Sequence, residues 1–506
     1  MTSPNLIQEV TKRSEKTTTV PTYDDPTEFD IQAAFRELLK VVQLQPEDTD
    51  GSITFTGEDP ILPSKHKLGA IMSLGMMGAA AATQILYRMR GGEAQDLSVD
   101  LRTAVGHINP LVAYTPKLGG IGYQLQFGDP RVNPIAFGIY PTRDDRWYLP
   151  TAAYPMSIPQ WLELLKCDLN PKSVGNAIAQ WDALDLENEA ASRGMIGSMC
   201  RTPEEWFKHP QGKLLSETPL VEIIKIGESN PELPSLVDKM RPLSGIKVAA
   251  NTHVIAGQVV GRTLAEQGAQ VLHFANPEFE YDALWVDTAA GFRSAWMDLK
   301  KPASREKANA LLKGADVFLE NYRGRKVAEM GFSPEAIAEI RPGIIYTSIR
   351  AFGWEGPWGQ RGGFDMDANC CTGFTVLEGT KDAPKLPPTV VLNDYLAGYL
   401  TAMGTIAALI LRAKFGGSYH VRTALSRFSM WYSTLGVMDP NYVAEKLKDP
   451  KHKIIQPKGM RGNHGLGEVD RLEPGVAYSK TPGYWKLPDG LIGVARGSSK
   501  PEWINQ

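Results

Sequence analysis

Short apolar runs alternate with segments of helical spacing in the second half of the chain. The runs, 246–252, 270–276, 315–322 and 343–353, have the length and composition of buried strands. The helical segments between them are 256–269, 305–314 and 333–341. Such alternation forms a parallel sheet covered by helices, with ligands at the carboxyl ends of the strands. We therefore predict a Rossmann-like α/β domain.

One helix-turn-strand unit occurs twice along the chain. Segments 84–101 and 409–425 each run from an apolar helix through basic residues and a glycine-containing turn into an alternating segment. Arg412 follows Arg88 by 324 residues, and the ends of the two segments keep the same offset. The first half of the chain is thus predicted to contain a partial copy of the second.

Proline and glycine residues at 232–245 interrupt regular secondary structure and predict a linker between the two copies. We expect four parts, a flexible leader, a degenerate partial unit with a small α+β domain, the Rossmann-like catalytic domain, and a C-terminal extension that starts another small domain. Their predicted bounds are 1–50, 51–235, 242–440 and 441–506.

The composition of the chain argues against several classes of protein. The chain is 42% hydrophobic and 22% charged, with a formal net charge of −3, so it lacks the basic footprint of a nucleic-acid binder. Its four cysteines form no C-x-x-C pair and no metal-like spacing with the eight histidines, so we expect reduced thiols and no metal site. The first residues lack the apolar core of a secretion signal, and a cytoplasmic protein is expected.

A single acid, Asp394, precedes the uncharged stretch 395–411. This stretch is at the short limit for a bilayer span and contains Gly398 and Gly404, so we predict a buried helix rather than a membrane segment. Asp394 is then either the N-cap of that helix or a reactive carboxylate.

The first strand-helix turn, 251–261, lacks G-x-G-x-x-G, which disfavours a plain NAD dehydrogenase. Its helix N-terminus still directs backbone N–H groups toward the edge of the sheet, where they can bind phosphate.

Five motifs follow one another between residues 242 and 425. They read "PLSGIKVAANTHVIAGQVVGRTLAEQGAQVLHF", "AWMDLKKP", "ADVFLENYRG", "IIYTSIRAFGWEGPWGQRGGFD" and "LNDYLAGYLTAMGTIAALI". In this order they resemble the family III CoA-transferases, the group of formyl-CoA and carnitine-CoA transferases. The resemblance implies an acyl-CoA:carboxylate CoA-transferase whose partners are an acyl-CoA and a carboxylic acid. It implies no permanently bound cofactor, because coenzyme A is a substrate.

The resemblance also implies roles for individual residues. Asp394 matches the family's nucleophile, which forms a mixed anhydride and then an aspartyl-CoA thioester. A helix N-terminus at this position is expected to lower the pKa of the carboxylate. The matching coenzyme A contacts are His253, Val254, Lys300, Asn321, Arg323 and Arg350.

Some positions depart from the family pattern. Ala275 and Asn276 replace an acidic-basic pair, and Glu329 replaces an arginine, so positive charge is lost near the expected nucleotide. Ala70 lies 324 residues before Asp394, so the N-terminal copy lacks the carboxylate. One active site per chain is expected.

Two alternative functions remain open. An α-methylacyl-CoA racemase shares these motifs but has a histidine where this chain has Phe364, and phenylalanine carries no proton. A catalytically silent binding subunit is the other alternative.

A glycine-rich loop at 458–468 is either a lid over the acyl site or a mobile surface loop. Family III enzymes are interlocked dimers, so a homodimer is expected, with a pseudo-dimeric monomer as the alternative.

Overall fold

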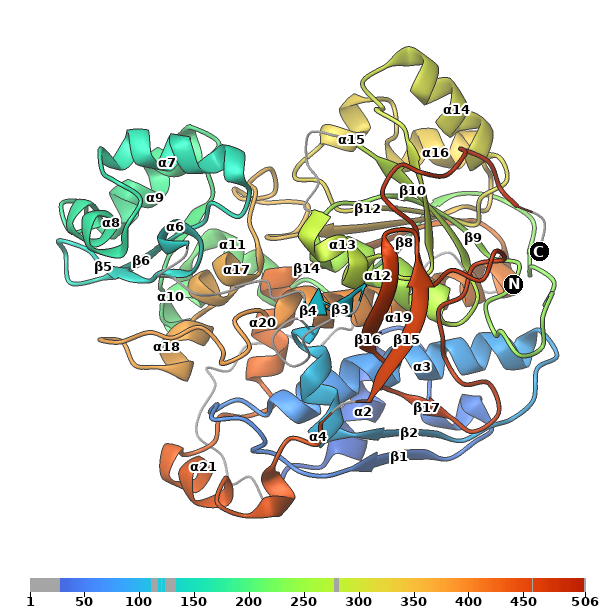
Figure 1. Cartoon of the computed structure of the whole chain (residues 1–506), viewed down its shortest axis with the longest axis horizontal. Coiled ribbons are helices and arrows are strands. Elements are labelled where there is room, and N and C mark those ends of the chain that lie inside the picture. The colour runs from blue at the N-terminus through green and yellow to red at the C-terminus, as the bar shows by residue number, and fades with distance from the viewer. Residues whose placement is uncertain are drawn as a thin grey trace.

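A seven-stranded sheet forms the centre of the protein (Figure 1). The computed structural model describes residues 28–110, 117–119, 121–122, 133–276, 282–456 and 458–504. The strand order is β11-β10-β9-β12-β13-β14-β8, all parallel except β8, which is antiparallel to β14. The bounds are β8 Glu222–Gly227, β9 Lys247–Asn251, β10 Gln270–Ala275, β11 Phe292–Trp296, β12 Val317–Glu320, β13 Ile345–Arg350 and β14 Ser418–Ala424. The predicted Rossmann-like α/β fold is confirmed.

Helices cover both faces of this sheet because its strands are apolar on both sides. In β9, Val248 and Ala250 pack in the main core with α12 and α19, whereas Ala249 faces the second core under α14 and α16. The helices of this half are α12 Ile255–Glu266, α13 Asp282–Thr288, α14 Pro302–Leu312, α15 Lys326–Glu329, α16 Pro334–Ile340, α17 Asp365–Thr372, α18 Phe374–Glu378, α19 Asn393–Phe415, α20 Leu425–Ser433 and α21 Pro440–Lys446.

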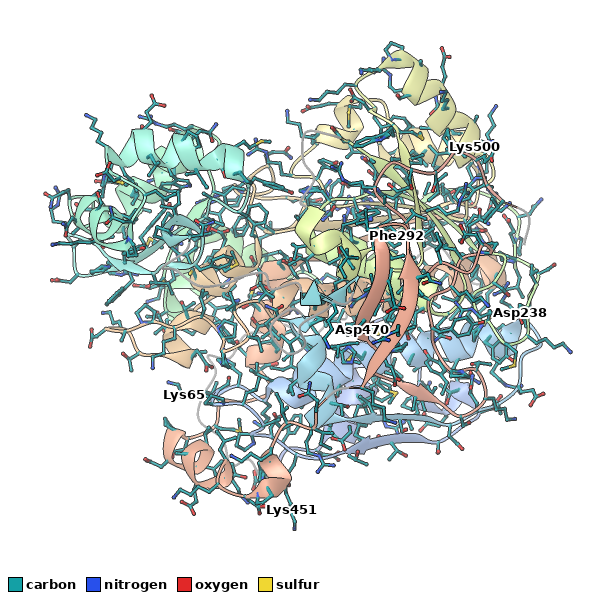
Figure 2. The ribbon with its side chains drawn as sticks, in the orientation of Figure 1. Lys65, Asp238, Phe292, Lys451, Asp470 and Lys500 are labelled. Atoms are coloured by element: carbon teal, nitrogen blue, oxygen red, sulfur yellow. The ribbon has the colours of Figure 1, made fainter. Side chains whose placement is uncertain are left out.

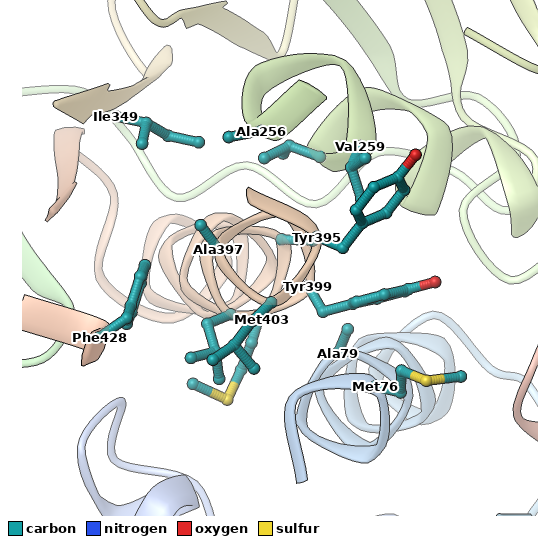
Figure 3. Packing of buried hydrophobic residues seen from close by; sticks show 14 of the residues in the cluster. Met76, Ala79, Ala256, Val259, Ile349, Tyr395, Ala397, Tyr399, Met403 and Phe428 are labelled. Atoms are coloured by element: carbon teal, nitrogen blue, oxygen red, sulfur yellow. The ribbon is translucent and has the colours of Figure 1, made fainter. Parts of the chain in front are cut away.

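Helix α19 lies between α12 and a long helix of the N-terminal half, α3 (Leu68–Met89), as Figure 3 shows. Close approach needs small residues, and a Cβ added at Gly398 would lie 2.2 Å from Val259 of α12. Both α3 and α19 are long and apolar enough to cross a membrane, but 100% and 94% of their most apolar windows are buried inside the protein. They are core helices, as predicted for α19.

The two copies of the predicted repeat have the same order of elements in the structure. Helix α3 leads into β2 (Leu97–Asp100) and α4 (Leu101–Ala104), as α19 leads into β14 and α20. A Cβ added at Gly75 would meet Leu396 and Tyr399, and Tyr399 is 324 residues after Gly75. Equivalent positions of the two copies thus pack against each other in the core.

The leader prediction is wrong for its second part. Residues 1–27 lie outside the described residues, but α2 (Ile31–Lys40) is a helix whose N-cap, Asp30, accepts hydrogen bonds from Gln32 and Ala33 N–H. Phe35 and Leu39 of this helix are fully buried in the main core. Two buried side chains on one helical face outweigh the polar composition on which the leader was predicted.

Residues 133–217 form a lobe, drawn in teal and green in Figure 1, and its part 135–199 has a hydrophobic core of its own. Its strands β5 Tyr140–Pro141, β6 Trp147–Pro150 and β7 Gly197–Met199 form a small sheet. Its helices are α6 Pro134–Phe137, η4 Pro155–Ser157, α7 Ile158–Leu165, α8 Pro171–Ile178, α9 Ala183–Ser192, α10 Pro203–Lys208 and α11 Pro210–Ser216. We call residues 133–217 the small lobe.

The C-terminal residues, predicted at 441–506 to start a small domain, pair in the structure with strands of the N-terminal half. Strands β15 (Gly459–His464) and β16 (Gly467–Leu472) form a hairpin that pairs with β3 (Lys117–Leu118). Strand β17 (Ala477–Tyr478) then joins β2. The segment 458–504 therefore runs back over both halves of the chain.

The remaining elements are η2 Pro46–Thr49, β1 Ile53–Thr56, η3 Val105–His107, β4 Ile121–Gly122 and η5 Pro450–His452. Figure 2 shows side chains across the molecule, with Lys451 and Lys500 exposed at its edge and Phe292 buried within it.

Candidate active site

A cavity of about 720 Å³ lies between the carboxyl edge of the large sheet and the small lobe. The sheet side supplies the turns after β9, β11, β12 and β13, and the small lobe supplies residues of 151–160 and 193–196. All the site residues predicted from the sequence line this one cavity, namely Asp394, His253, Val254, Lys300, Asn321, Arg323 and Arg350.

Two helices begin side by side at this edge. Helix α12 follows β9 and α19 precedes β14, so both run opposite to the parallel strands and start at their carboxyl ends. Val259 and Gly398 are in close contact, and each lies four residues after Ile255 and Asp394, respectively. The first turns of both helices, including Asp394, therefore meet at the floor of the cavity.

Asp394 is not the cap of its helix. The capping carboxylate is Asp365, whose Oδ2 accepts hydrogen bonds from the backbone N–H groups of Leu392 (2.8 Å) and Asp394 (2.9 Å). Its Oδ1 accepts a further bond from Asn369 Nδ2 at 2.9 Å. Within the described part of the chain, no group donates a hydrogen bond to the carboxylate of Asp394. The reactive carboxylate and the structural one are separate residues.

The pKa expectation for Asp394 is wrong. Burial raises the pKa of its carboxyl well above the usual range, and the neighbouring Asp365 raises it further. Burial likewise raises the pKa of Asp365 to about 7, although three backbone N–H groups oppose the shift. Removal from water therefore outweighs the helix N-terminus, and the charge of Asp365 opposes ionisation of Asp394.

His253, just before the start of α12, is held from several sides in the wall of the cavity. Its Nδ1 is hydrogen-bonded to the hydroxyl of Tyr154 from the small lobe. Its backbone N–H donates to Asn321 Oδ1 (3.0 Å), and Asn321 Nδ2 donates to its carbonyl (2.8 Å). Val254, next in the chain, has φ +25° and ψ 179°, a conformation that a β-branched residue rarely adopts. Strain of this kind is typical of functional turns.

The predicted coenzyme A contacts fall into two groups. Lys300 and Arg323 are exposed beside the cavity, and Arg323 Nη1 also donates to the carbonyl of Gly194 in the small lobe at 2.9 Å. The Arg350 side chain is only 4% exposed and forms a two-pronged ion pair with the buried Glu320, at 2.7 and 3.1 Å. The charge of Arg350 is thus neutralised internally, and Asn321 is occupied by the turn at His253.

Asn276, where the family pattern has a basic residue, is contacted by an arginine that the sequence did not indicate. Ala275 is buried at the end of β10, and Asn276 lines the cavity. Arg496, from the C-terminal segment, donates to the carbonyl of Asn276 at 3.4 Å and stacks over the ring of Trp296. Because these residues are 220 positions apart in the chain, no local motif signals that they meet.

Glu329 lines the cavity and pairs with Lys326 at 3.2 Å, one turn earlier. The glycine-rich segment 458–468 belongs to the β15-β16 hairpin and does not line the cavity, which favours a surface loop over a lid. In the described residues, no group of three or more His, Cys, Asp or Glu is arranged to hold a metal ion.

The N-terminal copy keeps the cap but not the nucleophile. Asp59 accepts hydrogen bonds from the N–H groups of Gly69 (2.9 Å) and Ala70 (2.8 Å), as Asp365 does for α19. Ala70 is 1% exposed and is not part of the cavity wall. The geometry agrees with a degenerate copy.

Comparisons with known proteins agree on one family. Residues 243–460 match the model of CoA-transferase family III. An acyl-CoA transferase of Gibberella moniliformis is 32% identical over 267 residues, covering 50% of this chain and 47% of the relative. A human succinyl-CoA:glutarate CoA-transferase is 26% identical, covering 52% and 58%. A formyl-CoA:oxalate CoA-transferase of Streptomyces coelicolor is 27% identical, covering 52% and 70%. The chain thus spans about half the length of the fungal relative.

Proposed function

We propose, from the match of residues 243–460 to the model of CoA-transferase family III, that the protein moves CoA from an acyl-CoA thioester to a carboxylic acid through Asp394. The observation that carries the proposal is the state of this carboxylate. It lines a large cavity and accepts no hydrogen bond in the described part of the chain, while Asp365 caps the helix. A partly buried carboxylate that accepts no hydrogen bond is costly to the fold and suited to reaction.

The first half of the reaction loads the enzyme. A carboxylate oxygen of Asp394 attacks the thioester carbonyl, the C–S bond breaks, and CoA leaves as a thiolate. The thiolate then attacks the Asp394 carbonyl of the resulting mixed anhydride and releases the donor's acid as a carboxylate. The product is an aspartyl-CoA thioester, and no proton is gained or lost.

The second half repeats these steps with the acceptor. Its carboxylate attacks the aspartyl thioester carbonyl and expels CoA thiolate, which then attacks the acceptor's acyl carbon and frees Asp394. Water would hydrolyse either intermediate, so the cavity has to exclude it. Apolar walls from Met195, Ile196 and Phe364 serve this purpose.

The ionisation of Asp394 fits this cycle. The nucleophile must be charged when it attacks, and its raised pKa makes the carboxylate more basic and more nucleophilic once the proton has left. Exposed cations at Lys300 and Arg323 suit the phosphates of coenzyme A at the outer end of the cavity.

Similarity to transferases named for glutarate and oxalate supports a carboxylic acid as the acceptor. The test is to incubate the protein with a panel of acyl-CoA donors and mono- and dicarboxylic acids and to identify new CoA thioesters by mass spectrometry. We expect transfer by wild type and none by Asp394→Ala with the fold intact. Full turnover by Asp394→Ala would overturn the proposal.

A further inference from the structure

The small lobe contributes a polar group directly to the reaction site. Tyr154 follows β6 and lines the same cavity as Asp394. Its hydroxyl is hydrogen-bonded to His253 Nδ1, and its ring lies 6.0 Å from the ring of Phe364. One tyrosine of the N-terminal half thus contacts two elements of the catalytic half.

The lobe that carries Tyr154 is fixed against the catalytic half. Thr151 and Ser198 donate hydrogen bonds to the buried Asp367 of α17 at 3.2 and 3.0 Å. Arg323 binds the carbonyl of Gly194, as described above. These contacts lie on both sides of the cavity, so Tyr154 is held in place rather than carried on a moving lid.

The imidazole of His253 is equally constrained. Asn321 holds the backbone on both sides, and the ring of Tyr322 lies 4.5 Å from the imidazole. Burial lowers the pKa of His253 to about 4, so the ring is neutral at neutral pH and carries one proton. With Nδ1 used by Tyr154, Nε2 is the nitrogen left for a substrate.

We propose that Tyr154 is a positioning residue for acyl transfer, which orients His253 at the start of α12 beside the nucleophile Asp394. When the Tyr154 O–H donates to Nδ1, the ring proton stays on Nε2. Nε2–H then donates a hydrogen bond to the carbonyl oxygen that becomes negative as Asp394 attacks. The proton stays on nitrogen throughout, so the balance of the reaction is unchanged.

This inference rests on the function proposed above and extends it. The N-terminal unit lacks a nucleophile, yet it completes the site on the catalytic half of the same chain. Both walls of the cavity therefore come from one polypeptide.

The test compares Tyr154→Phe, His253→Ala and the double variant. Loss of one positioned donor costs about 10² to 10³ in kcat, so we expect His253→Ala to fall in that range and Tyr154→Phe to lose about tenfold. The KM for acyl-CoA should stay within about threefold, because the contact stabilises the transition state rather than the bound substrate. The double variant should be no slower than His253→Ala, since Tyr154 acts through His253.

Tyr140→Phe is the matched control. It removes a hydroxyl of the same lobe that donates to the carbonyl of Pro134 at 2.9 Å, away from the cavity, and should leave kcat unchanged. A merely structural Tyr154 would lower the melting temperature and add its effect to that of His253→Ala. Wild-type kcat in Tyr154→Phe, or additive losses, would overturn the inference. Turnover by Asp394→Ala would instead overturn the proposed function.

Discussion

Replacing Asp365 by asparagine separates the charge of the second carboxyl from its capping role. The asparagine oxygen can still accept the N–H groups of Leu392 and Asp394, but the negative charge next to the nucleophile is removed. The new NH2 group faces Asn369 Nδ2, which costs stability by an amount independent of pH. The informative quantity is therefore the pH dependence of the free energy of unfolding.

The magnitude follows from the pKa of Asp365, raised from 3.8 to about 7 in the folded protein. A carboxyl with a raised pKa stabilises the fold at low pH, and this stability is lost as the pH rises through the folded value. For these two pKa values, the contribution of Asp365 to the free energy of unfolding falls by ~2.6 kcal/mol between pH 5 and pH 8. Relaxation of the buried pair reduces it, so we expect wild type to lose ~1–3 kcal/mol more than Asp365→Asn across this interval.

The assay is urea unfolding at pH 5 and pH 8, with Asp185→Asn, an exposed acid in the first turn of α9, as control. The same substitution should move the acid limb of the kcat/KM profile to lower pH, because Asp394 loses a like-charged neighbour. If Asp365→Asn and wild type lose equal stability between the two pH values, the argument from buried charge is refuted.

Other predictions follow from the rest of the site. Ala70→Asp should create no second active site, and calorimetry should count one equivalent of CoA per chain; two equivalents would contradict the degenerate copy. Arg350→Ala should lower the free energy of unfolding by about 3–5 kcal/mol, because it strands the buried carboxylate of Glu320; a normal urea midpoint with a raised KM for CoA would show a phosphate contact instead. With Phe364 beside the cavity, a 2-methylacyl-CoA in deuterated water should incorporate no α-deuterium above background; rapid exchange that depends on Asp394 would favour the racemase chemistry.

Sequence patterns predicted the parts of the fold that depend on local periodicity. Strands β9, β10, β12 and β13 and helices α12, α14 and α16 occur where the apolar spacing placed them, because both faces of the sheet are buried. Helix α13 and strand β11 were not predicted. The repeat was also readable, since the offset that aligns Arg88 with Arg412 aligns α3 with α19. Asp394 was found because a motif marks it.

Pairings between distant residues were not predictable. Asp365 accepts the backbone N–H of Asp394, 29 residues later, and Arg496 donates to the carbonyl of Asn276, 220 residues earlier. No rule of sequence spacing predicts either pairing. The charge of Arg350 suggested a phosphate contact, whereas only the fold reveals Glu320 beneath it. Tyr154 was missed because it lies in the other half of the chain. A site between two halves has to be assembled before its members are recognisable.

Covalent capture of the intermediate tests the central claim most directly. The protein is mixed with a competent acyl-CoA donor in the presence of hydroxylamine, digested, and analysed by mass spectrometry for a hydroxamate. The account predicts that hydroxylamine inactivates wild type only when donor is present and that the modified residue is Asp394. Modification of another residue, or transfer of CoA by a protein that never acquires the hydroxamate, would contradict it.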